Sequence, residues 1–372
     1  MKICIITQKV IRGDGQGRVN YEVTWEALRR NHEVNLVTGD LAQDLQQHPS
    51  ITWIQVSIRK IPSAILRNLW FGWQSAIWLN KNRQQFDIIF VNGGVTWGKS
   101  HFNAVHFVHS TWLQSPYHTS KIRKDFYGLY QYCVTSLNSI WERKSFEQSE
   151  HLIAVSNQVK RDLISLGTPE NKITVIRNGV DLEEFYPGPA QRDNLGLPSN
   201  KTVALFVGEI QSSRKNLDTT LKALVEVPDL HLAVVGRETG SPYLKMVKNL
   251  GLQKRVTFLG YRTDVAEIMR TVDFFVFPSR YETFGLVVLE AMASGLPVIT
   301  TKATAASELV DSKSGEILSD PNDVTDLIRA LTKFKEKTTI APKTIENFTY
   351  TWAQCYSCKA MAQKYLDIFN SR

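Results

Sequence analysis

The stretch SRYETFGLVVLEAMASGLPVITT, which runs from Ser279 to Thr301, contains one complete step of an α/β fold. It begins at the end of the apolar run DFFVFPS and closes with PVITT, and both runs are short and rich in aromatic or β-branched residues. Such runs are typical of buried strands. The segment FGLVVLEAMASG between them has the length and composition of a helix. A strand, a helix and a second strand in this order predict one unit of a parallel sheet.

Two carboxylates in this stretch need an explanation, because Glu is almost never fully buried without a partner. In one interpretation Glu282 complements the helix dipole and Glu290, eight positions later, lies on a solvated face. In the other, the free N–H groups of residues 284–287 at the helix start bind a diphosphate. Glu290 would then lie roughly 6 Å beyond Leu286 and accept hydrogen bonds from a ribose diol. Glu282 would face the sugar of the same nucleotide sugar.

The rest of the chain repeats the alternation of short apolar runs and longer helix-like segments. In the first half the expected strands are Lys2–Thr7, Glu33–Val37, Ile51–Ile54, Ile88–Asn92, Ala104–His109, Leu152–Val155 and Val175–Arg177. The expected helices there are Arg18–Arg30, Phe126–Gln148 and Asn157–Leu166. A segment rich in Gly, Pro and Asn follows, and then the alternation restarts at TVALFVG. We therefore predict an α/β protein with two doubly wound, Rossmann-like domains, 1–183 and 184–349.

Bulk composition is ordinary for a globular protein, with 43% hydrophobic and 22% charged residues. No apolar run approaches the roughly 18–20 residues that span a bilayer, and MKICIITQKV reads as a first strand rather than a signal peptide. Four cysteines fit a reducing compartment, so we expect a cytoplasmic protein. Cys355 and Cys358 form a C-x-x-C without a second pair, which gives little support for a metal or redox site.

The net charge of +8 lies mostly in the first half of the chain. Basic residues there cluster beside aromatic ones, and the residues concerned are Arg59, Lys60, Arg67, Trp70, Phe71, Trp73, Lys121, Arg123 and Lys124. These clusters fit anionic lipid head groups at the inner face of a membrane, or a phosphorylated acceptor. They also fit a solvated surface with some aromatics in the core. No nucleic-acid-binding motif is present, so no such partner is expected.

Two loops at expected strand ends suggest a bound anion. The loop Gly13–Arg18 contains Gly15 and Gly17 before a helix, and glycines let a backbone approach a phosphate closely. Many glycine loops are only turns, and this one is neither G-x-G-x-x-G nor a Walker motif. Gly208 leads into a loop that places Arg214 and Lys215 just before another helix. Adjacent cations there are unfavourable for the helix dipole unless an anion binds.

Taken together, these motifs resemble the family-4 retaining glycosyltransferases of the GT-B fold over nearly the whole chain. The resemblance rests on ETFGLVVLEAMASGLPVITT, the glycine loop with RRNHEVNLVT behind it, LIAVSNQVKRDL, ITVIRNGVDLEEFYP, LFVGEIQSSRKNLD, LAVVGRE and VTFLGYRTDV. It implies two domains facing each other across a cleft, which close over the donor, and a C-terminal helix at 350–372 that packs back on the first domain. A narrower similarity, through SIWERKSFEQSE and the Arg214–Lys215 tandem, points to lipopolysaccharide-core glucosyltransferases.

The resemblance also implies roles for individual residues. The side chains expected to act in catalysis are His109, Arg214, Lys215 and Glu282. The residues expected to bind the donor are Gly15, Gly17, Gly208, Arg214, Lys215, Gly236, Leu259, Tyr261, Glu282, Thr283, Phe284, Gly285, Leu286, Val287 and Glu290. The segments Pro62–Trp78 and Thr111–Phe126 would be variable loops that select the acceptor.

The implied reaction moves a sugar from a nucleoside-diphosphate sugar to a hydroxyl of a glycan or lipid-linked acceptor of the cell-envelope polysaccharide or lipopolysaccharide type. A UDP-sugar is favoured over a GDP-sugar. No D-x-D motif occurs, in agreement with a family that requires neither a metal nor another cofactor. Peripheral contact with a membrane through the basic, aromatic first domain is a further expectation.

One position departs from the family pattern. Many members carry Arg directly after the glycine of the FVG strand, whereas this chain has Glu209. This position motivates one alternative, a non-catalytic subunit that binds a sugar nucleotide, although the Arg214–Lys215 tandem favours a cation that has been relocated rather than lost. A separate alternative is a glycosyltransferase with a small-molecule acceptor. A GT-B epimerase or phosphorylase ranks lower, and a dinucleotide oxidoreductase is disfavoured by the absence of G-x-G-x-x-G.

Overall fold

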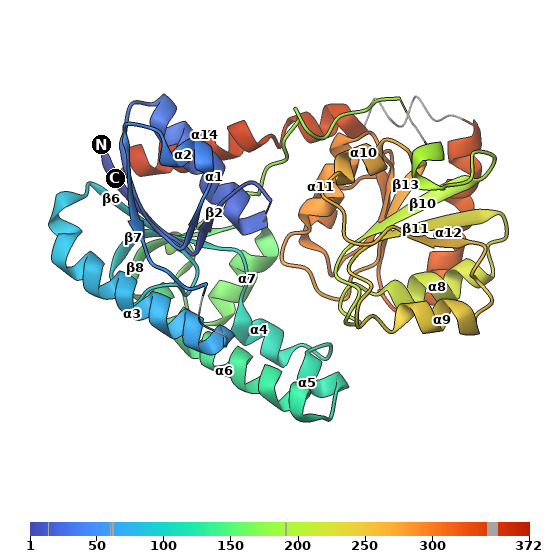
Figure 1. Ribbon diagram of the computed structural model, residues 1–372, viewed down its shortest axis with the longest axis horizontal. Coiled ribbons are helices and arrows are strands. Elements are labelled where there is room, and N and C mark those ends of the chain that lie inside the picture. The colour runs from blue at the N-terminus through green and yellow to red at the C-terminus, as the bar shows by residue number, and fades with distance from the viewer. Residues whose placement is uncertain (14, 60, 62, 190–191, 341–348) are drawn as a thin grey trace. The chain divides into compact units, whose positions relative to one another are not determined.

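The computed structural model describes residues 1–372 except 14, 60, 62, 190–191 and 341–348, and it divides the chain into two compact units (Figure 1). The N-terminal unit comprises Met1–Gly179 and Cys358–Arg372, and the C-terminal unit comprises Val180–Ser357. Each unit is built on a parallel sheet with helices on both faces, so the predicted α/β class with two doubly wound sheets is confirmed.

The sheet of the N-terminal unit has seven strands in the order β5-β3-β1-β6-β7-β8-β9, and neighbouring strands run parallel. These strands are β1 (Lys2–Ile6), β3 (Glu33–Thr38), β5 (Ile51–Gln55), β6 (Ile88–Asn92), β7 (Ser100–Val105), β8 (Ser149–Ala154) and β9 (Ile173–Val175). A short pair, β2 (Lys9–Val10) and β4 (Asp40–Leu41), lies apart from this sheet. The helices are α1 (Gly15–Arg29), α2 (Gln43–Gln46), α3 (Ala64–Asn82), α4 (His109–Gln114), α5 (Thr119–Ile122), α6 (Phe126–Glu147), α7 (Asn157–Ser165) and α14 (Cys358–Asn370).

Two apolar cores lie on the two faces of this sheet. On one face α14 packs beside α1, and the rings of Tyr365 and Phe369 contact Phe90 with centroids 5.6 and 5.4 Å away. An ion pair of 2.7 Å between Arg30 and Asp367 joins the ends of the two helices. On the other face α3 inserts Phe71 and Leu79, which are fully buried. The C-terminal helix therefore contributes directly to the core of the N-terminal unit.

The sheet of the C-terminal unit has six strands in the order β12-β11-β10-β13-β14-β15, again parallel throughout. They are β10 (Thr202–Val207), β11 (Leu230–Val235), β12 (Val256–Phe258), β13 (Phe274–Phe277), β14 (Val298–Thr301) and β15 (Gly315–Leu318). The helices are α8 (Leu217–Val225), α9 (Tyr243–Asn249), α10 (Val265–Met269), α11 (Leu286–Ala293) and α12 (Val324–Ile340). The strand order reverses between β10 and β13, and doubly wound sheets bind ligands outside the carboxyl ends of the strands at such a point.

Three expectations about the N-terminal unit were wrong. The strand expected at Ala104–His109 is β7 and ends at Val105, because His109 begins α4 instead, with its N–H bound to a buried carboxylate. Pro62–Trp78 is not a variable loop, since most of it lies in α3 and packs on the sheet, while Pro62 itself lies outside the described residues. Thr111–Phe126 is largely helical as well, in α4 and α5.

The end of the chain is divided between the two units. Residues 349–354 are helical, Ser357 forms an isolated parallel bridge with Val180, and α14 begins at Cys358. The unit boundaries at Gly179 and Ser357 lie a few residues from the expected 183 and 350. No helix in the described part of the chain has both the length and the apolar character to cross a bilayer.

Candidate functional site

The carboxyl ends of β10 and β13 carry two loops that meet at the reversal point of the C-terminal sheet. The loop after β10 contains Arg214 and Lys215, and the loop after β13 contains Glu282. The Lys215 ammonium contacts the Glu282 carboxylate directly, and Arg214 Nη1 lies 3.6 Å from the same oxygen, Oε2. Both partners of the direct contact are largely buried, with side chains 12% and 15% exposed. Two cations therefore surround one carboxylate at this edge of the sheet.

Burial dominates the electrostatics of this pair. It lowers the pKa of the Lys215 ammonium below its ordinary value, although Glu282 opposes the shift. Burial alone would raise the pKa of Glu282, but Lys215 and Arg214 outweigh it and hold that pKa below its ordinary value. The Lys215 Nζ also lies 5.0 Å from the centre of the Phe277 ring, which can stabilise a cation by its quadrupole. A cation that is costly to bury gains free energy from a bound polyanion.

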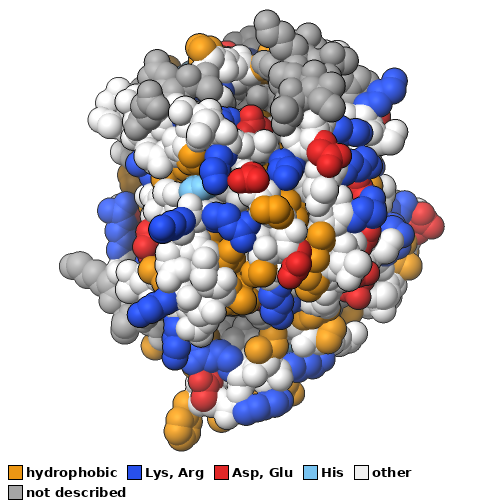
Figure 2. Space-filling view, turned by 90° about the vertical axis from the view of Figure 1, so that its right-hand side faces the viewer, with side chains coloured by type: hydrophobic (Ala, Val, Ile, Leu, Met, Phe, Trp, Pro, Cys, Tyr) orange, Lys and Arg blue, Asp and Glu red, His pale blue; other side chains and the backbone are white. Residues whose placement is uncertain are grey.

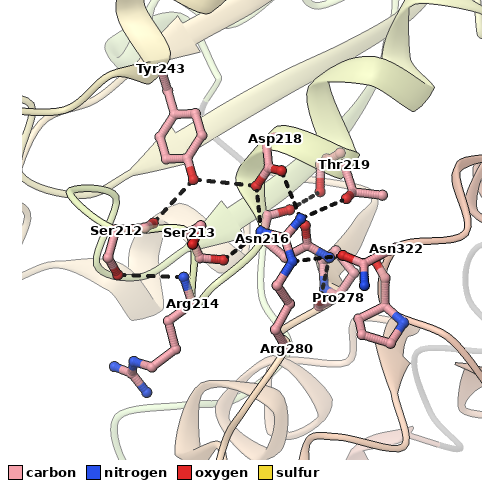
Figure 3. A network of polar contacts seen from close by, with 12 residues as sticks. Ser212, Ser213, Arg214, Asn216, Asp218, Thr219, Tyr243, Pro278, Arg280 and Asn322 are labelled. Atoms are coloured by element: carbon pink, nitrogen blue, oxygen red, sulfur yellow. Dashed lines mark hydrogen bonds and ion pairs between the residues drawn. The ribbon is translucent and has the colours of Figure 1, made fainter. Parts of the chain in front are cut away.

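A polar network behind this pair fixes the two loops to each other (Figure 3). Arg280 donates to both carboxylate oxygens of Asp218 at 2.8 and 2.7 Å and to the carbonyl oxygen of Ser213 at 2.7 Å. Its own N–H donates to the carbonyl oxygen of Arg214 at 2.9 Å. Arg280 lies two residues before Glu282, and Asp218 lies three residues after Lys215. The bidentate contact between Arg280 and Asp218 therefore positions both members of the ion pair.

The turn into α8 depends on Asn216 in the same network. Its backbone is left-handed, with φ of 65°, and its side-chain amide donates to the carbonyl oxygen of Pro278 at 2.9 Å. It also donates to the carbonyl oxygen of Pro321. Tyr243 completes the set, because its hydroxyl lies 3.1 Å from the carbonyl oxygen of Ser212 and 3.4 Å from Asp218. These contacts leave the loop that bears the cations little freedom to move independently.

Glu209, the residue at the unusual position, is part of this loop as well. Its carboxylate accepts hydrogen bonds from the N–H of Gln211, the N–H of Ser212 at 2.8 Å and the Ser212 hydroxyl at 2.6 Å. The carboxylate therefore closes a local turn, and it shapes the loop that carries Arg214 and Lys215.

The N-terminus of α11 is the third part of the site. Gly285 caps the helix with φ of 93°, and a Cβ atom there would lie 2.7 Å from Cγ2 of Thr304. Only glycine fits this position without displacing its neighbours. Glu282 is held by its backbone, which pairs with residues 303–305 through hydrogen bonds of 3.0 and 3.1 Å. Glu290 lies on α11 and is half-buried.

The remaining predicted donor residues of this unit lie at neighbouring strand ends. Gly236 follows β11, and a Cβ atom on it would lie 2.5 Å from the carbonyl oxygen of Gly208. Its N–H donates to Gly260, next to Leu259, which is half-buried, and Tyr261, which is 70% exposed. Thr283 and Phe284 are buried, and Leu286 and Val287 are half-buried in the first turn of α11. The structure therefore brings Gly208, Arg214, Lys215, Glu282 and Gly285 together within one unit.

Two of the three residues predicted in the N-terminal unit line a cavity of about 280 Å³. His109 and Gly17 line it, whereas Gly15 is exposed at the start of α1 and does not. Amide side chains dominate the polar lining, and they are Gln8, Gln16, Asn68, Asn92 and Asn138. Trp141 supplies an aromatic surface. Amides, a histidine and an aromatic ring are groups that can bind a polyol.

Glu142 also lines this cavity and was not predicted from the sequence. Its carboxylate is 2% exposed and accepts from the N–H and the Nδ1 of His109, both at 2.8 Å, and from the N–H of Ser110 at 2.9 Å. Since Nδ1 donates to the carboxylate, Nε2 is left to face Asn138, 3.3 Å away. A glutamate on an amphipathic helix reads as a surface residue, so only the fold reveals this role.

Comparisons with known proteins agree with this geometry. The sequence profile described as "Glycosyltransferase Family 4" matches residues 13–184, and the profile described as "Glycosyl transferases group 1" matches residues 188–351. A curated relative, the D-inositol 3-phosphate glycosyltransferase of Mycobacterium tuberculosis (strain ATCC 25618 / H37Rv), is 37% identical over 174 residues. That alignment covers 44% of this chain and only 36% of the relative.

Solved structures extend the likeness in fold to the whole chain. Sucrose-phosphate synthase from Thermosynechococcus elongatus has a TM-score of 0.79 at 20% identity, and WaaG, a glycosyltransferase involved in lipopolysaccharide biosynthesis, has 0.78 at 19%. Anabaena HepE in complex with UDP-glucose has 0.74 at 20%. All of each chain is covered in these three alignments.

The two parallel sheets and the strand-end site thus define a protein of the GT-B class. Within that class the chain belongs to glycosyltransferase family 4.

Proposed function

We propose that the protein is a retaining glycosyltransferase that moves a sugar from a nucleoside-diphosphate sugar to an acceptor hydroxyl. The observation that carries this proposal is the contact of Lys215 and Arg214 with Glu282 at the reversal point of the C-terminal sheet. Two cations in a largely buried position are suited to neutralise the charge that develops on a departing diphosphate. Glu282 holds them in place and faces the sugar.

The donor would lie across the three parts of the site described above. The N–H groups of residues 285–287, at the start of α11, would bind the diphosphate, and Gly285 would let it come close. Glu290 would bind the ribose, and Leu259 and Tyr261 would border the base. A UDP-sugar is favoured, and HepE, which shares the fold, binds UDP-glucose. Gly15 and Gly17, in the glycine-rich segment at the start of α1, would contact the same diphosphate.

In the chemical step the bond between C1 of the sugar and the diphosphate oxygen breaks, and the acceptor oxygen bonds to C1 on the same face. The proton of the acceptor hydroxyl goes to the departing phosphate. Lys215 and Arg214 stabilise that phosphate, and they supply the positive charge that a metal ion supplies in other transferases. We therefore propose that no divalent cation is needed. Turnover that is unchanged after chelation with EDTA would support this, and loss of turnover that Mg²⁺ restores would contradict it.

The acceptor would place its hydroxyl beside His109 in the cavity of the N-terminal unit. The amide lining favours an uncharged polyol, so a glycan or a lipid-linked sugar of the cell envelope fits well. A small-molecule acceptor is the second candidate, because the curated relatives are named D-inositol 3-phosphate glycosyltransferases. Lys9 is the only cationic side chain among the residues described around the cavity, which argues for a neutral acceptor over a phosphorylated one.

The test is a turnover assay of the purified chain with UDP- and GDP-sugars, in which release of free nucleoside diphosphate is measured with and without glycan, lipid-linked and inositol phosphate acceptors. Release that requires Lys215 and Glu282, and a product whose anomeric configuration matches the donor by NMR, would support the proposal. Saturable binding of a sugar nucleotide without any release would favour the non-catalytic alternative. Inversion at C1 would contradict the retaining mechanism.

A further inference from the structure

Helix α3 is apolar on two opposite faces. Its core face consists of Phe71, Gly72, Ser75 and Leu79. Successive residues turn by about 100° along a helix, so Leu66, Trp70, Trp73 and Ile77 form a stripe on the side opposite to that core face. Their exposed fractions are 54%, 42%, 49% and 37%. Packing within the unit explains the apolar residues on the core face of α3, but it does not explain the exposed apolar stripe on the opposite side.

Helix α6 repeats this arrangement. Its buried residues are Gly128, Thr135, Glu142, Ser145 and Phe146. The opposite side carries Phe126, Leu129, Tyr130 and Ile140, which are 93%, 60%, 40% and 62% exposed. We call these four residues, together with the stripe on α3, the α3–α6 face. Eleven of the eighteen large hydrophobic side chains that are exposed in the described residues lie between Leu66 and Ile140.

The two stripes belong to one layer of the N-terminal unit. The crossovers from β5 to β6 through α3 and from β7 to β8 through α6 advance in the same direction across the sheet, so right-handed connections put both helices on one face. A hydrogen bond of 3.3 Å between the side chains of Asn68 and Asn138 joins the helices directly. Figure 1 shows α3 and α6 running alongside each other. Each stripe lies on the side of its helix opposite the buried residues, so the two exposed apolar stripes belong to the same layer of the unit.

Exposed cations outnumber exposed acids around this face. Exposed cations accompany the apolar stripes, and they are Arg67, Lys81, Lys121, Arg123, Lys124, Arg143 and Lys144. Between Ala64 and Glu147 the helices carry two acids: Glu142, whose carboxylate is buried against His109, and Glu147, which is exposed at the end of α6. Asp125, which precedes α6, caps that helix and pairs with Arg123 at 2.5 Å. On the side of the molecule drawn in Figure 2, by contrast, acidic and basic side chains are interspersed.

We propose that the α3–α6 face is a docking surface for an anionic lipid bilayer. Trp and Tyr side chains favour the boundary between head groups and acyl chains, and exposed Leu, Ile and Phe side chains would insert just below it. The surrounding Lys and Arg side chains would attract anionic head groups, at about 1 kcal/mol for each one near the surface. The face differs from the clusters expected from the sequence, since Phe71 belongs to the core and Arg59 pairs with Asp40 at 2.7 Å. This inference does not depend on the catalytic assignment.

A vesicle flotation assay with the purified full-length chain tests the proposal. Vesicles of phosphatidylcholine alone are compared with vesicles containing about 30% phosphatidylglycerol, each at about 0.05 M and about 0.5 M salt. We expect binding to the anionic vesicles that weakens at high salt, and little binding to the neutral ones. Equal binding to both compositions, or none to either, would overturn the proposal.

Two pairs of variants locate the surface. Trp73→Ser with Phe126→Ser should lower the partition coefficient at least about tenfold, whereas the control Ile164→Ser with Leu244→Ser, two exposed apolar residues elsewhere, should not. Arg67→Glu with Lys81→Glu should have the same effect, against the control Lys245→Glu with Lys248→Glu on α9. All these side chains are exposed, so unchanged melting temperatures are expected. If the face variants lose self-association in light scattering while vesicle binding stays intact, the face joins two copies of the chain and the proposal is wrong.

Discussion

Lys215 and Glu282 stand 67 positions apart in the chain, and their charged groups are in direct contact at the carboxyl ends of β10 and β13. The Arg280–Asp218 ion pair links the two loops that bear Lys215 and Glu282, and Gly285 caps α11 close to Glu282 in the chain. Each of these contacts has a consequence that can be measured separately.

Replacing Lys215 by Met keeps the apolar stem and removes the charge. We expect kcat for sugar transfer to fall roughly 100-fold, because the largely buried cation that would stabilise the leaving diphosphate is lost. The control is Lys222→Met on α8, where the lysine is exposed. Equal activity of the two variants would contradict the role assigned to Lys215.

The Lys215–Glu282 contact should also affect the free energy of unfolding. Lys215→Met alone leaves the buried Glu282 carboxylate with the N–H of Phe284 and with Arg214, 3.6 Å away, as the cation that still faces it. Since an unpaired buried charge is costly, we expect the single variant to lose about 2 kcal/mol of unfolding free energy. The double variant Lys215→Met with Glu282→Gln should recover part of this loss in urea denaturation. Additive losses would show that the two side chains are not coupled.

The Arg280–Asp218 contact should affect catalysis indirectly, by positioning Lys215 and Glu282. Arg280→Lys keeps the positive charge but removes the bidentate contact with Asp218. The loops that bear Lys215 and Glu282 should then no longer be held in a fixed position relative to each other. We expect kcat to fall about tenfold, with a smaller change in the KM of the donor. Arg262→Lys is the matched control, because that arginine forms its ion pair with Asp264, two residues later in the same loop. An equal effect of both variants would indicate general destabilisation.

Gly285 should not tolerate a side chain. In Gly285→Ala the new Cβ meets Thr304 Cγ2 at 2.7 Å, in addition to the strain of a positive φ. Gly251→Ala has a similar strain, with φ of 70°, but nothing within 4 Å of the new atom. We therefore expect Gly251→Ala to cost about 1 kcal/mol and Gly285→Ala clearly more, with donor binding impaired only in the latter. Adding Thr304→Ser, which removes Cγ2, should restore part of the binding.

The C-terminal unit should lose stability in mild acid through His231. Burial, assisted by Lys201, lowers the pKa of His231 to about 4, while its unfolded value is about 6.5. The stabilisation is therefore present above pH 6.5 and is lost as the pH falls toward 4. At pH 4.5 the loss should reach about 2 kcal/mol. Denaturation of wild type and His231→Gln at pH 7 and pH 4.5 isolates the effect, and parallel losses in both proteins would contradict it.

Much of the fold could be predicted because its elements are periodic and local. Ile88–Asn92 was predicted to the residue, and the runs TVALFVG, DFFVFPS and PVITT match β10, β13 and β14 to within two residues at each end. The end of β7 was misplaced because a distant carboxylate, Glu142, caps α4 at His109 and starts a helix there. The chain before position 142 contains no local sign of this contact.

The sequence predicted which residues belong to the candidate site, but not which of them contact one another. Arg214, Lys215 and Glu282 were each singled out, yet their pairing depends on the strand order, which one sequence does not contain. Asp218 and Arg280 were missed, since a charged residue near a helix start has many ordinary explanations. Glu209 was interpreted only as a position whose usual cation has moved to Arg214 and Lys215, and the sequence did not reveal that its carboxylate orders the turn beside Ser212.

The proposed function requires that the Lys215–Glu282 pair marks a sugar-nucleotide site. Isothermal titration of UDP, GDP, ADP and TDP and their common sugars into the wild-type chain and into Lys215→Met tests it most directly. We predict saturable binding of one nucleotide class, UDP first, that weakens at least about tenfold in the variant because a cation–phosphate contact is lost. Binding of none of these ligands, or equal binding by both proteins, would contradict the account.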